Sequence, residues 1–232
     1  MNGPAQFEEQ LVRITAAPVT LEGNLTLPEK AIGIVLFAHG SGSSRHSPRN
    51  RYVARLLNEA KLGTLLVDLL TAEEEVTDMR TAHLRFDIGL LARRLVAVTD
   101  WLTQQPHTRA VPIGYFGAST GAGAALVAAA ERPEAVAAIV SRGGRPDLAG
   151  PALARVRAPT LLIVGSRDVQ VIELNRLALA QLRCEKRLEI IPGASHLFEE
   201  PGALDAVARL AREWFEHYLS PRESEAKSYG KE

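Results

Sequence analysis

The sequence of residues 110–130 is AVPIGYFGASTGAGAALVAAA, and this stretch decides the fold class. Residues 111–116 form a short apolar run typical of a buried strand, and residues 120–132 form an alanine-rich stretch typical of a helix. Between them lies the pattern G-x-S-x-G, centred on Ser119. Glycines and a proline interrupt the uncharged stretch, so we expect a strand, a sharp turn and a helix rather than a membrane span.

The same alternation of strands and helices continues on both sides of this turn. Two apolar runs, residues 11–16 and 19–27, are bounded by prolines and predict an antiparallel pair at the edge of a sheet. The remaining pattern predicts an α/β fold with a mostly parallel central sheet and helices on both faces. The expected strands are residues 32–38, 64–70, 111–116, 136–140, 160–164 and 187–191, and the expected helices are residues 52–60, 83–105, 120–132, 171–182 and 202–219.

The chain has 232 residues, which favours one domain, here residues 1–219, followed by a polar C-terminal tail at residues 220–232. Lys and Arg total 27 and Asp and Glu total 27, so the formal net charge is zero. This balance argues against a nucleic-acid-binding face and against a polybasic membrane patch. The N-terminal residues lack the pattern of a secretory signal, and the single Cys184 has no partner for a disulfide or a zinc site. We therefore expect a cytoplasmic protein without a metal site.

Ser119 stands where a strand turns sharply into a helix, the position of the nucleophile in G-x-S-x-G enzymes. Glycines suit the flanking positions because side chains there would collide with the strand and the helix. A serine hydroxyl attacks a carbonyl group efficiently only when a base removes its proton and an acid orients that base. In this class of fold the chain order is serine, then acid, then histidine. Asp168 and His196 follow predicted strands in that order, in the segments GSRD and PGASH.

Both partners of the serine have alternative interpretations. Asp168 could instead cap the helix expected at residues 171–182, in which case Glu173 or Asp147 would be the acid. His196 competes with other histidines, but only His196 follows both the serine and the acid in a loop that leaves a strand. The competing histidines are His39, His46, His83, His107 and His217.

A tetrahedral intermediate also needs backbone N–H groups directed at its oxygen atom. Thr120 offers one, since it begins the helix just after the proposed nucleophile. The glycine-rich loop at residues 39–43, HGSGS, follows a strand and offers the second. Ser41 is the expected donor in this loop, and Gly42 is the alternative.

Four segments together resemble the α/β-hydrolase superfamily, specifically its dienelactone hydrolase-like group. They are HGSGSS at residues 39–44, GASTGA at 117–122, GSRD at 165–168 and PGASH at 192–196, and the resemblance covers residues 20–219. It implies an enzyme that cleaves esters or lactones through an acyl-serine intermediate without a cofactor. Dienelactone hydrolase proper has a cysteine nucleophile where this chain has Ser119, which puts the dienelactone substrate in doubt. The segment SRGGRPD is also similar to loops of hydrolase units fused to phosphoribosyltransferases.

The segment at residues 141–158 bears on the substrate. It leaves room for a short helix at most, so we expect a minimal cap and a shallow cleft suited to small or short-acyl substrates. Arg142 and Arg145 on this segment, and Arg45 after the glycine-rich loop, could bind an anionic group of the substrate. Alternatively, these arginines pair with acids such as Asp147 and serve the fold.

Three functions fit these features. The order and placement of Ser119, Asp168 and His196 favour a serine hydrolase of small esters or lactones. An acyltransferase or perhydrolase would use the same residues and pass the acyl group to an acceptor other than water. A non-catalytic interaction module of the same fold would not need an intact triad.

Overall fold

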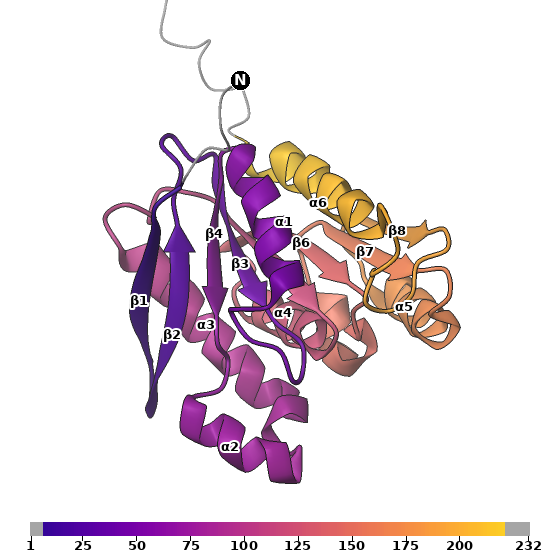
Figure 1. The fold of residues 1–232 in the computed structure, drawn as a ribbon, viewed down its shortest axis with the longest axis horizontal. Helices are drawn as coiled ribbons and strands as arrows, with labels where there is room; N and C mark the ends of the chain where they lie inside the picture. The colour runs from indigo at the N-terminus through magenta and orange to yellow at the C-terminus, as the bar shows by residue number, and fades with distance from the viewer. Residues whose placement is uncertain (1–6, 221–232) are drawn as a thin grey trace, which may run out of the picture.

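The computed structural model describes residues 7–220, in which eight strands form one sheet flanked by helices (Figure 1). The strand order is β1-β2-β4-β3-β5-β6-β7-β8. The β1–β2 and β2–β4 pairs are antiparallel, and all the remaining pairs are parallel. The predicted α/β fold with an antiparallel edge is therefore confirmed. The strands are β1 (Glu9–Ala16), β2 (Val19–Thr26), β3 (Gly33–Ala38), β4 (Leu62–Val67), β5 (Ile113–Ala118), β6 (Val136–Arg142), β7 (Thr160–Gly165) and β8 (Lys186–Ile191).

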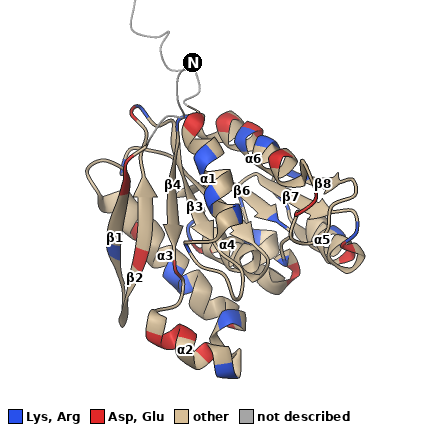
Figure 2. Ribbon diagram, in the orientation of Figure 1, with Lys and Arg blue, Asp and Glu red and all other residues tan. Residues whose placement is uncertain are grey.

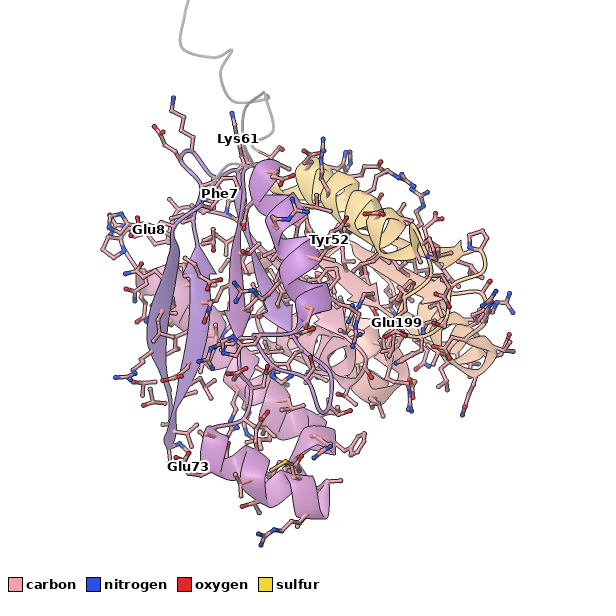
Figure 3. The ribbon with its side chains drawn as sticks, viewed as in Figure 1. Phe7, Glu8, Tyr52, Lys61, Glu73 and Glu199 are labelled. Atoms are coloured by element: carbon pink, nitrogen blue, oxygen red, sulfur yellow. The ribbon has the colours of Figure 1, made fainter. Side chains whose placement is uncertain are left out.

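Helices cover both faces of the sheet, as the alternating pattern predicts. Helices α1 and α6 pack together on one face, and α3, α4 and α5 lie on the other (Figure 1). Tyr52 of α1 donates a hydrogen bond to Asp205 of α6, and Figure 3 shows Tyr52 between these two helices. The helices are α1 (Pro48–Glu59), α2 (Ala72–Thr81), α3 (Ile88–Gln104), α4 (Thr120–Glu131), α5 (Val169–Gln181) and α6 (Ala203–Leu219), and the 3₁₀ segments are η1 (Leu84–Phe86) and η2 (Pro146–Arg155).

The central strands are buried on both faces, which explains why their sequences lack polar alternation. Phe37 of β3 and Phe116 of β5 belong to the core layer under α1 and α6, with ring centroids 4.8 Å apart. Leu36 and Tyr115, one residue earlier on the same strands, belong to the layer under α3 and α4. Two separate apolar layers therefore use alternate side chains of the same strands.

The carboxyl ends of the central parallel strands lie together at one edge of the sheet. Ala38 of β3 pairs with Gly117 of β5, and Ala118 of β5 pairs with Arg142 of β6. The loops that carry the predicted functional residues leave the sheet from this edge. After β6 the chain forms only η2 before it enters β7, which confirms the expectation of a minimal cap at that point.

The segment between β4 and α3 differs from the prediction. The apolar periodicity predicts one helix over residues 83–105, which is wrong at its start, because α3 begins at Ile88 and a separate helix, α2, precedes it. Helix α2 contains one buried residue, Asp78, so it has no apolar stripe to predict it. Its N-terminus does carry a local signal, since Thr71 and Glu74 form a reciprocal capping box.

Charged residues of both signs are dispersed over the helices (Figure 2). Helix α2 begins with Glu73, Glu74 and Glu75, an arrangement that the positive N-terminal end of a helix favours. No helix within residues 7–220 is long and apolar enough to cross a bilayer. The polar tail predicted at residues 220–232 lies, apart from Ser220, outside the described residues.

Arg94 of α3 connects α2 to the segment that follows β4. Its guanidinium group donates to both carboxylate oxygens of Glu74 and to the carbonyl oxygen of Leu69. The Arg94 side chain is 5% exposed, so removal of Glu74 would leave a buried cation without a counter-charge. Hydrogen bonds from Arg94 outweigh the opposing effect of burial and hold the pKa of Glu74 below its usual range. This stabilisation is complete above the ordinary glutamate pKa and is lost as the pH falls through the lowered value.

We expect Glu74→Gln to lower the free energy of unfolding by about 2 kcal/mol at neutral pH, because it leaves Arg94 buried without a counter-charge. Glu73→Gln is the matched control, because Glu73 lies in the same helical turn and is exposed. Denaturant unfolding of the two variants measures the difference. If Glu74→Gln and Glu73→Gln unfolded at the same denaturant concentration, with the same dependence of free energy on denaturant, this role of the ion pair would be contradicted.

Candidate functional site

Ser119 occupies a strained turn between β5 and α4. Its backbone angles are φ 50° and ψ −124°, a conformation that residues with a side chain seldom adopt. A Cβ atom on Gly117 would lie 2.5 Å from the Cα atom of Ala122, and one on Gly121 would lie 2.2 Å from the carbonyl oxygen of Ala38. Both flanking glycines are therefore required by close backbone contacts, as the G-x-S-x-G pattern predicts.

The structure brings Asp168 and His196 together at the carboxyl ends of β7 and β8. Asp168 Oδ2 lies 2.5 Å from His196 Nδ1. A carboxylate only accepts, so Nδ1 carries the proton of a neutral imidazole and Nε2 is left as the basic nitrogen. Asp168 directly precedes α5, but its side chain makes no capping hydrogen bond to this helix. The alternative in which Asp168 serves as a helix cap is therefore not supported. The other candidate acids form ion pairs elsewhere, Asp147 with Arg145 and Glu173 with Arg176.

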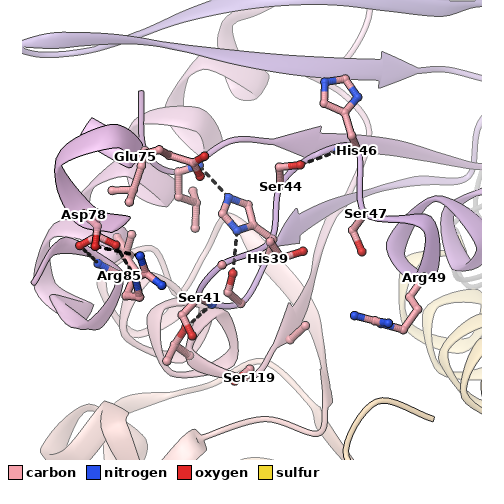
Figure 4. A pocket seen from close by; sticks show the side chains of 18 of the residues that line it. His39, Ser41, Ser44, His46, Ser47, Arg49, Glu75, Asp78, Arg85 and Ser119 are labelled. Carbon is pink, nitrogen blue, oxygen red and sulfur yellow. Dashed lines mark hydrogen bonds and ion pairs between the residues drawn. The ribbon is translucent and has the colours of Figure 1, made fainter. Parts of the chain in front are cut away.

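Ser119 and His196 line the same pocket, which has a volume of about 670 Å³. Its walls come from the glycine-rich loop, the start of α1, the α2–η1 segment, the turn at Ser119 and the end of β6. Figure 4 shows part of this arrangement, with labelled residues of the glycine-rich loop, α1 and the α2–η1 segment around the same pocket as Ser119. The α2–η1 wall, which includes Met79 and Arg85, is absent from the predicted site because α2 itself was not predicted. Within residues 7–220, no three His, Cys, Asp or Glu side chains are grouped so that they could hold a metal ion.

The predicted oxyanion-hole residues lie beside the serine. The Thr120 N–H group is in the first turn of α4, where N–H groups have no partner within the helix. The Ser41 N–H group donates to Thr120 Oγ1 at 3.0 Å, so a hydroxyl oxygen satisfies it in this structure. A Cβ atom on Gly40 would lie 2.8 Å from Ser119 Cβ, which shows how closely the loop approaches the serine. The alternative donor, Gly42, also lines the pocket.

The three predicted substrate-binding arginines have different environments. Arg45 forms ion pairs with Asp68 and Glu22, which attach the glycine-rich loop to β2 and to the end of β4. Arg145 donates two hydrogen bonds to Asp147. Neither lines the pocket, so the expectation that they surround the cleft is corrected. Arg142 does line it, although its place in a substrate complex stays a prediction.

Residues 60–220 match the model of the dienelactone hydrolase family. The chain belongs to this family. A crystal structure of a dienelactone hydrolase from Anabaena variabilis is 68% identical, has a TM-score of 0.91, and is matched over 93% of this chain and 100% of that chain. An α/β serine hydrolase without a lid from Xanthomonas campestris shares the fold at 20% identity with a TM-score of 0.72, over 95% and 100% of the two chains.

Longer relatives exist in Mycobacterium tuberculosis. Two curated proteins that carry a provisional phosphoribosyl transferase name are 59% identical over 219 residues, covering 94% of this chain and 48% of theirs. This member of the dienelactone hydrolase family therefore spans about half the length of those relatives.

His39 is a functional candidate that sequence reasoning considered only as a rival base. It lies in the pocket wall, and both ring nitrogens are engaged, Nδ1 with the Gly40 carbonyl oxygen at 3.0 Å and Nε2 with the Leu69 N–H group at 3.1 Å. The carbonyl must accept and the N–H group must donate, so the ring is neutral and protonated at Nδ1. His39 thus positions the glycine-rich loop. Its place directly before Gly40 is the feature of the sequence that could have indicated this role. Of the other rival histidines, His46 lines the pocket, whereas His83, His107 and His217 do not.

Gly121→Ala should lower the free energy of unfolding by at least about 3 kcal/mol, or prevent folding, because the new methyl group meets backbone rather than a movable side chain. Gly89→Ala is the control, since Gly89 is the second residue of α3 as Gly121 is of α4. A Cβ atom on Gly89 approaches only the ends of the Arg93 and Asp87 side chains, at 3.3 and 3.4 Å. We expect this control to be neutral or up to about 1 kcal/mol more stable, as measured by thermal and denaturant unfolding. A Gly121→Ala protein as stable as the control would show that the turn at Ser119 can relax.

Proposed function

We propose that this protein is a serine hydrolase that cleaves small carboxylic esters or lactones through an acyl-serine intermediate. The observation that carries the proposal is the joint presence, at one pocket, of a serine on a strained turn and a histidine oriented by Asp168. The name of the Anabaena relative, dienelactone hydrolase, supports an ester or lactone as the substrate. Ser119 stands in place of the cysteine of dienelactone hydrolase proper, so we propose an oxygen ester rather than a thioester as the intermediate.

In the first half of the proposed reaction, Ser119 Oγ attacks the carbonyl carbon of the substrate. His196 Nε2 accepts the hydroxyl proton, and Asp168 stabilises the imidazolium ion through the Nδ1–H hydrogen bond. The bond to the leaving alcohol then breaks, and His196 returns the proton to the leaving oxygen. The products of this half are the free alcohol, or the ring-opened alcohol of a lactone, and acyl-Ser119.

In the second half, water attacks the acyl-serine carbonyl carbon while His196 Nε2 takes a proton from the water. Collapse of the second tetrahedral intermediate releases the carboxylic acid and restores the Ser119 hydroxyl group. In both halves the negative oxygen is held by the N–H groups of Thr120 and Ser41. The Ser41 N–H group exchanges the Thr120 hydroxyl, its acceptor in the free protein, for the substrate oxygen.

A fluorophosphonate probe tests the proposal directly, because it phosphonylates an activated serine. We expect the adduct on Ser119 by peptide mass spectrometry and its absence from Ser119→Ala. Hydrolysis of 4-nitrophenyl acetate should fall by at least about 10⁴-fold in kcat/KM for Ser119→Ala and His196→Ala. Asp168→Asn should lose between about 10²- and 10⁴-fold, because the imidazole then favours the wrong tautomer.

Glu173→Gln is the matched control for the acid, since Glu173 is a carboxylate near Asp168 that pairs with Arg176. It should retain the activity of the unmodified protein. A fully active Asp168→Asn variant would overturn the assignment of the acid, and labelling of a residue other than Ser119 would overturn the whole mechanism. Adding methanol or hydrogen peroxide to the assay measures whether the acyl group passes to an acceptor other than water.

Hydrolysis should decline as the acyl chain grows beyond a few carbons. After β6 the chain forms only η2 before β7, so within residues 7–220 no cap at that point extends the apolar lining of the pocket, which includes Leu69, Leu70 and Met79. Each methylene that the pocket did bury would raise kcat/KM by about fourfold, from about 0.8 kcal/mol per CH₂ group. A series of 4-nitrophenyl esters from acetate to decanoate measures this dependence. A steady rise along the series would reveal a long apolar groove and contradict the expected preference for short chains.

A further inference from the structure

The imidazole of His196 has little packing of its own to hold it. Its side chain is 41% exposed, whereas the Asp168 side chain that orients it is 16% exposed. A general base must be held within a fraction of an ångström of its working position by the groups around it. The direction of the His196 ring toward Ser119 therefore depends on how the backbone of its loop is fixed.

Phe198, two residues after His196, fixes one side of this loop. Its side chain is 1% exposed and belongs to the core layer under α1 and α6. Its backbone φ angle is 55°, which bulky residues seldom adopt and which persists only where surrounding contacts impose it. The Phe198 N–H group donates to the Ser195 carbonyl oxygen at 3.2 Å, so the strained residue closes a tight turn that contains His196.

Glu200 fixes the other side of the same turn. Its Oε2 atom accepts a hydrogen bond at 3.0 Å from the N–H group of Ser195, the residue directly before His196. This N–H group makes the largest contribution to holding the pKa of Glu200 below its usual range, so the carboxylate is ionised at neutral pH. Hydrogen bonds to a charged acceptor are stronger than those between neutral groups.

Glu200 also contacts the loop that carries the acid. Its Oε1 atom lies 3.8 Å from Nη1 of Arg167, the residue directly before Asp168. The Arg167 N–H group donates to the Ala194 carbonyl oxygen at 3.0 Å, and a Cβ atom on Gly165 would lie 2.3 Å from that same oxygen. The loop of the acid and the loop of the histidine are therefore in direct backbone contact, and Glu200 bridges them.

We propose that Glu200 is a positioning residue, which fixes the backbone before His196 and so directs His196 Nε2 toward Ser119. The inference rests on the proposed function for the role of His196 as the base. Glu200 is not among the described residues that line the pocket, so it acts through His196 rather than on the substrate. A displacement of a catalytic group by about 1 Å can lower a rate by about 100-fold, which makes one backbone hydrogen bond consequential here.

Two substitutions separate the reach of the Glu200 side chain from its charge. Glu200→Gln keeps an acceptor oxygen at the same reach, whereas Glu200→Asp keeps the charge and is one methylene too short. We expect Glu200→Asp to lower kcat for 4-nitrophenyl acetate at least about tenfold and to change KM less than about twofold. Glu200→Ala should lose at least as much, and Glu200→Gln should stay within about threefold of the unmodified protein.

Glu199→Ala is the matched control. Glu199 is the adjacent carboxylate, and it pairs with the Arg49 side chain instead of the backbone of the histidine loop. Its removal should change kcat for 4-nitrophenyl acetate less than about twofold. Tm of every variant, measured alongside, separates a loss of stability from a loss of positioning.

The tautomer of His196 gives a second readout that needs no turnover. The ¹⁵N chemical shifts of a neutral imidazole distinguish a proton on Nδ1 from one on Nε2, and the bond to Asp168 favours Nδ1. In the Ser119→Ala protein we expect the Nδ1–H tautomer, and it should persist when Glu200→Gln or Glu199→Ala is added. Adding Glu200→Asp or Glu200→Ala should give a mixture of the two tautomers.

The inference is overturned if Glu200→Asp and Glu200→Ala keep both kcat and the tautomer, even where Tm falls, because Glu200 would then serve only the fold. A loss in Glu200→Gln as large as in Glu200→Asp would equally overturn it, since reach would not be what matters. If Glu200→Ala fails to fold, the comparison of Glu200→Asp with Glu200→Gln decides. The proposed function has a separate failure, the absence of probe labelling at Ser119 in the unmodified protein, and the tautomer measurement does not depend on that result.

Discussion

The first turn of α4 lies so close to the ends of β3 and β5 that neither Gly117 nor Gly121 has room for a Cβ atom. This contact forces the intervening Ser119 to a positive φ angle and presents its side chain at the carboxyl edge of the sheet. The same turn is held to β6 by hydrogen bonds from Ser119 N–H to Arg142 and from Arg145 N–H to the Ser119 carbonyl oxygen. The geometry of the pocket around Ser119 depends on this one close approach of helix and sheet.

Buried arginines in this protein have two different environments. Arg94 is surrounded by acceptors, and its ion pair with Glu74 attaches a helix that buries little apolar surface of its own. Arg142 is also buried, at 8% exposed against 4% for Arg94, and has no acidic partner within residues 7–220. The first arrangement stabilises the fold, whereas the second leaves an attraction for an anion that the folded chain does not satisfy. The second arrangement occurs beside Ser119, in the pocket that Ser119 and His196 line.

The glycine-rich loop is held from several sides. His39 bonds to Gly40 and Leu69, the Ser41 N–H group donates to Thr120, and Arg45 connects the loop to Asp68. Rigid donors are needed if N–H groups are to stabilise developing negative charge without reorganising. Arg45 therefore contributes to the pocket through the loop that it anchors, although it does not face the cavity.

The sequence by itself determined the order of the elements and the turn at Ser119. Periodicity revealed the strands and most helices because their burial is strong, and the G-x-S-x-G pattern is local, since its glycines are required by contacts of the turn itself. Helix α2 escaped detection because it is attached by a polar contact with Arg94 and lacks an apolar stripe. Only the tertiary structure decided which arginines face the pocket. Arg45 and Arg142 carry the same guanidinium group. Folding brings Asp68, which is distant in the sequence, within reach of Arg45, whereas it brings no acid to Arg142 among the described residues.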